Sequence, residues 1–221
     1  MDRKKETISL IIGFLGSMLG LFGVVMFNQY ILMSLPLAVR MIMMIVTYWA
    51  IAIVPIIIMF RDKKPVSEYG FCREHVFRQI LIGVVLGMAM SAVFTLTPHL
   101  LGFGEYFDSG KRYLYLWQYV YEFVYCIIAV GFSEELVFRG FLYKKFKAVF
   151  GTEIAAVVGS SVLFGLFHIF GGNIGQIIMT GFLGVLFCLF RMKIKGCSTL
   201  SLIIMHGVYD ALITVWANVL I

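Results

Sequence analysis

The stretch TISLIIGFLGSMLGLFGVVMF, residues 7–27, contains no charged side chain. Uncharged apolar runs of about 18 residues or more are typical of helices that cross a membrane. Similar runs recur along the chain, separated by short polar segments. They predict about seven transmembrane helices, at residues 7–27, 41–60, 77–97, about 117–143, 154–171, 174–190 and 200–220.

The composition predicts the same class of protein. Hydrophobic residues make up 61% of the 221 residues and charged residues only 14%, which is far from the composition of a soluble globular domain. We therefore expect an all-α, polytopic membrane helix bundle with the lipid bilayer as its surroundings. The basic residues at the amino terminus precede an apolar run that is too long for a signal peptide and lacks a small-residue cleavage site, so this run is expected to stay as the first span.

The basic residues predict the orientation, because lysine and arginine concentrate on the cytoplasmic side of membrane proteins. With the amino terminus in the cytoplasm and seven spans, all of the 18 lysines and arginines except Arg40, Lys111 and Arg112 fall on the cytoplasmic side. The carboxyl terminus is then outside. This placement accounts for the net charge of +6 without a nucleic-acid partner. The small size and the use of Ile, Phe and Lys favour a bacterial plasma membrane.

Polar and ionisable residues inside membrane spans are costly and commonly functional. Here they form a short set on three predicted helices: Glu134, Glu135, Arg139, His168, His206 and Asp210. The four cysteines show no metal-ligand spacing and are interpreted as packing residues. No serine or cysteine has a convincing base partner, and HExxH is absent, which excludes the commoner protease classes.

Glu134 and Glu135 are predicted to have different roles. On an α-helix Glu135 and Arg139 are four residues apart with the acid first, the favourable arrangement for an ion pair. Glu134 points roughly 140° away from Arg139, since an α-helix has 3.6 residues per turn. Glu135 and Arg139 are therefore expected to form a structural pair, while Glu134 faces a reactive site. Structural hydrogen bonding by both glutamates is the alternative.

The other polar residues lie on two further helices. Phe164 and His168 share one face of the stretch SVLFGLFHIF, residues 161–170, and His206 and Asp210 share one face of MHGVYD, residues 205–210. Singly, each histidine could be a satisfied core residue. The depth of these residues in the membrane favours a common site. At a rise of 1.5 Å per residue, Glu134 lies about 15 Å and His206 about 16 Å from the cytoplasmic end of its span. Asp210 lies about 22 Å and His168 about 24 Å from the corresponding ends, so all four can reach the middle of the membrane.

A carboxylate and two imidazoles in a cavity that excludes bulk water can activate a water molecule against a carbonyl group, so we expect peptide-bond hydrolysis. Two arrangements remain open. Glu134 and His168 could polarise the water while His206 and Asp210 stabilise the oxyanion. Alternatively, Glu134, His168 and His206 could bind a catalytic zinc ion whose fourth ligand is the attacking water.

The three elements EELVFRG, FGLFH and HGVYD together resemble the CPBP family, which contains CAAX endopeptidases that trim prenylated proteins and bacterial bacteriocin-processing and self-immunity relatives. The family pattern is EExxxR, then FxxxH, then HxxxN or a close variant. The chain matches it with Glu134, Glu135, Arg139, Phe164, His168 and His206. Asp210 stands where the eukaryotic enzymes have asparagine, and an ionised aspartate cannot donate a hydrogen bond to an oxyanion.

The resemblance covers about residues 115–220. No linker or low-complexity tract breaks the chain, so we expect one integrated membrane domain with N-terminal spans in residues 1–112. The resemblance implies that residues 113–221 form a catalytic helical core whose cavity lies among the last four spans. It further implies an intramembrane endopeptidase of the metalloprotease or glutamate-protease type, acting on a membrane-associated peptide or protein. The main alternative is a non-catalytic bacteriocin self-immunity or scaffold protein. A transporter is disfavoured because paired broken helices and repeats are missing from the sequence.

Overall fold

The computed structural model describes residues 3–104, 110–170 and 174–220, and this part of the chain is helical with no strand. The predicted all-α class is confirmed. The α-helices are α1 (Arg3–Tyr30), α2 (Leu37–Tyr48), α3 (Ala50–Asp62), α4 (Val76–Ser91), α5 (Leu116–Tyr125), α6 (Phe132–Glu135), α7 (Tyr143–Phe150), α8 (Glu153–Phe167), α9 (Ile174–Lys193) and α10 (Thr199–Val219).

Six helical segments of the described chain are long and apolar enough to cross a membrane. They are Arg3–Ser34, Leu37–Asp62, Val76–Phe103, Glu153–Phe170, Ile174–Lys193 and Thr199–Val219. These segments confirm a polytopic integral membrane protein. They correspond to six of the seven predicted spans, although residue 171 at the end of one predicted span lies outside the described residues.

The remaining predicted span, about 117–143, is helical but is not one of these six. It belongs to a continuous helix from Leu116 to Phe150, in which α5, α6 and α7 are joined by the π-helical segments Cys126–Gly131 and Leu136–Leu142. This helix carries four charged residues within the predicted span, Glu122, Glu134, Glu135 and Arg139. The number seven is therefore approximate, since the helix that carries the motif EELVFRG is not among the six segments.

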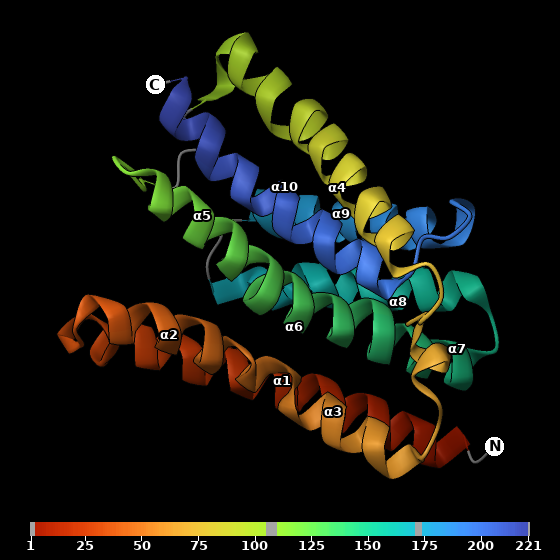
Figure 1. Cartoon of the computed structure of the whole chain (residues 1–221). Coiled ribbons are helices and arrows are strands. Elements are labelled where there is room, and N and C mark those ends of the chain that lie inside the picture. Colours follow the sequence, from red (N-terminus) through yellow and green to blue (C-terminus); the bar gives the residue numbers. More distant parts are fainter. Residues whose placement is uncertain (1–2, 105–109, 171–173, 221) are drawn as a thin grey trace.

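The helices pack around this motif-bearing helix, which we call the central helix (Leu116–Phe150). Figure 1 shows α1 and α3 side by side on one side of it, and α10 on the other with α4 packed against α10. The pair α8 and α9 packs together, and α8 also contacts α7. The central helix thus contacts both the N-terminal helices and the C-terminal helices.

Two glycines allow α10 to approach the central helix closely. A Cβ atom on Gly131 would lie 2.5 Å from the carbonyl oxygen of Ile203, and one on Gly207 would lie 2.5 Å from the Cα atom of Ile127. Neither distance is tolerable between real atoms, so both positions require glycine. Small residues at crossings of membrane helices let the backbones come together. Here the crossing brings His206, next to Gly207, against the helix that carries Glu135.

A buried lysine joins the N-terminal helices to the end of the central helix. Lys145 on α7 is fully buried, with its Nζ atom 2.7 Å from Glu6 Oε2 and 2.6 Å from Asp62 Oδ2. Glu6 comes from α1 and Asp62 from the end of α3. A buried ammonium group needs such compensation, because burial of an unpaired charge is expensive. This ionic cluster therefore ties α1, α3 and α7 to one another.

Candidate functional site

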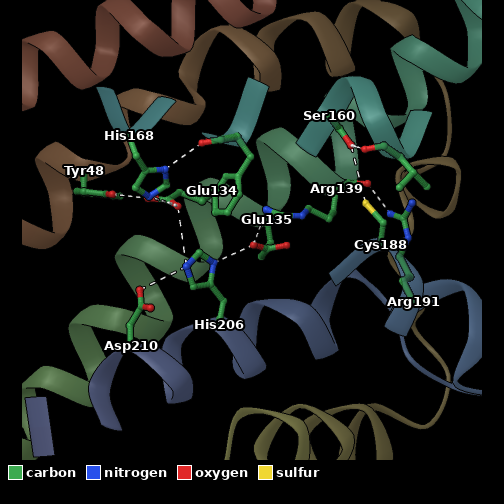
Figure 2. Close-up of polar contacts among 12 residues, drawn as sticks. Tyr48, Glu134, Glu135, Arg139, Ser160, His168, Cys188, Arg191, His206 and Asp210 are labelled. Carbon is green, nitrogen blue, oxygen red and sulfur yellow. Dashed lines mark hydrogen bonds and ion pairs between the residues drawn. The ribbon is translucent and has the colours of Figure 1, made fainter. Parts of the chain in front are cut away.

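The predicted site residues come together from three separate helices. Figure 2 shows Glu134 and Glu135 on α6 facing the imidazoles of His168, which follows the end of α8, and of His206 on α10. Asp210 lies on α10 beside His206. Residues far apart in the sequence thus surround one buried position in the bundle. They do so although a rise of 1.5 Å per residue predicts membrane depths for His168 and Glu134 that differ by about 9 Å.

Glu134 lies between the two imidazoles. Its Oε2 atom is 4.0 Å from His168 Nε2 and 3.9 Å from His206 Nε2, while the residue is only 2% exposed. This oxygen is buried and has no hydrogen-bond partner within the described residues. Buried polar atoms usually have a partner, so an orphaned carboxylate oxygen needs an explanation. The two separations are too long for direct hydrogen bonds but suit a small bridging group.

The other oxygen of Glu134 is fixed by a residue that sequence reasoning missed. The hydroxyl of Tyr48, the last residue of α2, donates a hydrogen bond to Glu134 Oε1 across 2.5 Å. Tyr48 also packs edge-on against Tyr125 of the central helix, with ring centroids 6.1 Å apart. A tyrosine in an apolar run has no spacing that distinguishes it from a packing aromatic, so the sequence offered no signal for this contact.

Glu135 connects the ion pair to the imidazole site. Its Oε1 atom accepts a hydrogen bond from Arg139 Nη1 at 2.9 Å and lies 2.8 Å from His206 Nδ1. Arg139 is 1% exposed, and its guanidinium lies 4.0 Å from the ring centre of Phe164 and 4.7 Å from that of Phe187. Cations over aromatic faces gain electrostatic attraction, especially when they are desolvated. The motif residue Phe164 therefore packs directly on the charged pair.

The geometry of the ion pair differs from a regular α-helix. A regular α-helix has 3.6 residues per turn, whereas the segment Leu136–Leu142, which contains Arg139, is π-helical. Short π-helical segments inside α-helices occur often at functional sites. The four-residue spacing of Glu135 and Arg139 nevertheless still brings their side chains together.

His168 presents one nitrogen to the site and uses the other for the backbone. Its Nδ1 atom lies 2.9 Å from the carbonyl oxygen of Phe164. Because a carbonyl only accepts, Nδ1 carries the proton there and the Nε2 lone pair of a neutral ring faces Glu134. The His168 side chain is 22% exposed, the more accessible of the two imidazoles. The residue is thus oriented to accept a proton or a hydrogen bond.

His206 lies between three carboxylates. Besides its contacts with Glu134 and Glu135, its Nε2 atom lies 3.3 Å from Asp210 Oδ2. Asp210 is the most accessible of the three acids, with a side chain that is 28% exposed. Ionised carboxylates only accept hydrogen bonds, so an imidazole that carries protons on both nitrogens satisfies this environment best.

The donor atoms suit zinc in type but not in spacing. Zn–N and Zn–O bonds of about 2.0–2.2 Å at tetrahedral angles place two ligand atoms about 3.4 Å apart. The separations of 4.0 and 3.9 Å from Glu134 Oε2 to the imidazole nitrogens are wider. No group of three His, Cys, Asp or Glu residues in the described ranges has the geometry of a metal site. As arranged, the set does not fit a bound zinc ion.

Comparisons with known proteins point to one family. Residues 116–212 match the family model described as type II CAAX prenyl endopeptidase Rce1-like. No curated protein and no solved structure matches the chain. The matched range includes Glu134, Glu135, His168, His206 and Asp210, whereas Tyr48 lies outside it. The motif-bearing part of this chain, residues 116–212, is therefore similar to the Rce1-like family, in agreement with the CPBP resemblance of its three motifs.

Proposed function

We propose that the protein is an intramembrane endopeptidase, which hydrolyses a peptide bond of a membrane-associated peptide or protein. The family match supports a protease, and the buried, orphaned Oε2 atom of Glu134 between two imidazole nitrogens is the observation that carries the mechanism. Glu134 and His168 are proposed as the water-activating pair, and His206 with Asp210 as the group that stabilises the oxyanion.

The attacking water is proposed to lie between Glu134 Oε2 and His168 Nε2. An oxygen atom about 2.8 Å from each acceptor fits across their separation of 4.0 Å. The water then donates one hydrogen to the carboxylate and the other to the imidazole, which leaves a lone pair free to attack the substrate carbonyl. Glu134 takes a proton as the new C–O bond forms, and the carbonyl oxygen becomes an oxyanion.

His206 is proposed to donate a hydrogen bond from Nε2 to that oxyanion and to keep its proton. Glu135 holds the opposite nitrogen at 2.8 Å and so fixes the orientation of the ring. Asp210 supports the charged imidazole from 3.3 Å, acting through His206 rather than on the oxyanion itself. When the tetrahedral intermediate collapses, the proton held by Glu134 passes to the leaving amine, so each bond that breaks has its proton supplied.

The membrane topology proposed from the charge distribution places the amino terminus in the cytoplasm and the carboxyl terminus outside, in a bacterial plasma membrane. The substrate is then presented at the cytoplasmic half of the bilayer. The family description names a CAAX prenyl endopeptidase. A prenylated CAAX peptide is therefore one test substrate, and peptide precursors, signal-peptide remnants and membrane anchors are the others.

The test compares wild-type cells with cells that express Glu134→Gln at equal membrane levels, by quantitative analysis of peptide termini in the membrane fraction. Glutamine keeps the size of the side chain but cannot accept the water proton. We expect a set of termini to disappear with Glu134→Gln and to persist with the matched exposed control Glu74→Gln. Unchanged termini in the Glu134 variant would favour a non-catalytic immunity or scaffold role.

A further inference from the structure

A pocket lies apart from the candidate active site. It has a volume of about 500 Å³ and is formed where the end of α3, the loop after it and the start of α10 meet. Its walls are mostly apolar and include Met59, Phe60, Val66, Phe71, Leu136 and Leu200. Pockets of about 300–1,000 Å³ with apolar walls and a few polar groups are typical of small-ligand sites.

The charged groups of this pocket are cations. Lys63, Lys64 and Arg73 line it, and none of the acidic residues that the structure describes does. Lys64 is paired with Glu6 at 3.3 Å. Within the described residues, neither Lys63 nor Arg73 has a carboxylate partner within ion-pair distance. An apolar pocket whose rim carries uncompensated positive charge complements a molecule with an apolar body and an anionic end.

The pocket lies at the membrane boundary. Lys63 follows Asp62, the last residue of the candidate span Leu37–Asp62. Phe60, one turn earlier, is 78% exposed, and Val66 on the other side of the boundary is 45% exposed. The apolar walls therefore begin within the span while the cations follow its end. Phospholipids have the same order of apolar chain and charged headgroup, and basic pockets between membrane helices bind anionic headgroups.

We propose that this pocket binds an anionic phospholipid, with one acyl chain against Phe60, Phe71 and Leu200 and the headgroup phosphate on Lys63 and Arg73. The lipid also contacts the central helix through Leu136, which follows the pair Glu134 and Glu135. The proposal does not depend on the protease reaction. It assigns a lipid site to the end of α3 whether or not the protein cleaves a substrate.

The first test measures binding of phosphatidylglycerol and of phosphatidylcholine to the purified full chain in detergent, by native mass spectrometry. The double variant Lys63→Gln, Arg73→Gln removes both uncompensated charges. The matched control Lys193→Gln, Lys195→Gln removes two exposed cations at the end of α9 that do not line the pocket. We expect about 5-fold weaker phosphatidylglycerol binding for each charge removed from the rim, and no change in the control.

Two further measurements distinguish the contribution of the lipid's acyl chain from that of its headgroup. Lysophosphatidylglycerol, with a single chain, should displace the bound lipid, whereas inorganic phosphate should not. Equal binding of phosphatidylcholine and phosphatidylglycerol, or displacement by phosphate alone, would overturn the proposal. The same holds if the rim variant binds as tightly as the wild type.

Cys72 provides a readout inside the pocket. It is exposed and lines the pocket, whereas Cys126 and Cys188 are buried, and burial raises the pKa of the Cys197 thiol to about 11. Because the thiolate is the reactive form, a thiol reagent at neutral pH should modify Cys72 first. Phosphatidylglycerol is expected to slow this modification several-fold in the wild type but not in the rim variant. Equal protection of both proteins contradicts the assigned site.

Discussion

The hydroxyl of Tyr48 donates a hydrogen bond to Glu134 Oε1 across 2.5 Å, although Tyr48 lies in the N-terminal spans and outside the range that matches the family. The bond occupies one oxygen of the carboxylate and leaves the other to face the imidazoles. The N-terminal helices are therefore in direct contact with the candidate site rather than a separate membrane anchor.

Replacing Tyr48 by Phe should lower kcat about 10-fold with little change in KM, because the ring is kept while the carboxylate loses the bond that orients it. Activity of reconstituted protein on a cleaved substrate measures this split. The control is Tyr121→Phe, which removes a hydroxyl that donates a hydrogen bond to the backbone carbonyl of Met41 at 2.8 Å. Equal kinetics in wild type and Tyr48→Phe would show that the bond does not orient the base.

Asp210→Asn and Asp210→Ala should behave differently. An asparagine amide can donate a hydrogen bond to an oxyanion, whereas alanine leaves His206 Nε2 without its contact at 3.3 Å. We expect Asp210→Asn to retain activity within about 3-fold and Asp210→Ala to lose at least about 10-fold in kcat. Steady-state kinetics of the two variants, matched for the amount of folded protein, provide the check. Similar losses in both would mean that the ionised carboxylate itself is required.

Arg139→Ala should destabilise the fold strongly, because Glu135 would remain buried and uncompensated. Breaking a buried ion pair typically costs about 3–5 kcal/mol, which corresponds to a Tm lower by roughly 10 °C for a chain of this length. Thermal unfolding in detergent measures the shift. The double variant Glu135→Leu, Arg139→Leu should regain much of this stability while remaining inactive, since the orientation of His206 is lost. Failure of the second substitution to restore any stability would show that packing on Phe164, rather than charge, explains the loss.

Lys145→Met and Lys147→Met form a matched pair on one helix. Lys145 is fully buried between Glu6 and Asp62, whereas the Lys147 side chain is 53% exposed and pairs with Glu153 at the surface. We expect a loss of about 3–5 kcal/mol for the first variant and less than about 1 kcal/mol for the second. Thermal stability in detergent distinguishes them. Equal stability of the two variants would contradict the assignment of Lys145 as the link between α1, α3 and α7.

The sequence predicted those features that the bilayer itself imposes. A membrane-spanning helix needs a long apolar run, so six of the seven predicted spans correspond to segments able to cross a membrane, and the seventh lies within the central helix. The costly polar residues Glu134, His168 and His206 were expected to gather in one site, and a nitrogen of each imidazole lies within 4.0 Å of Glu134 Oε2. The range that matches the Rce1-like family model, residues 116–212, contains the same three motifs.

Other features depend on packing that leaves no periodic pattern. The π-helical segment around Arg139, the hydroxyl of Tyr48 on Glu134 and the aromatic pair Phe164 and Phe187 around the guanidinium arise from contacts between distant helices. The three lysines of α7 look alike in sequence, as cytoplasmic charges after a span. Only the tertiary structure shows that Lys145 is buried while Lys147 remains exposed.

The ionic cluster around Lys145 limits how this protein can be recombined. A chimaera that joins its motif-bearing half to the first two spans of another membrane protein would leave the buried ammonium group of Lys145 without its partners Glu6 and Asp62. Such a graft would have to import both acids at matching heights, as well as a tyrosine in place of Tyr48. The first two spans and the motif-bearing part are therefore expected to function in a chimaera only when they are transferred together.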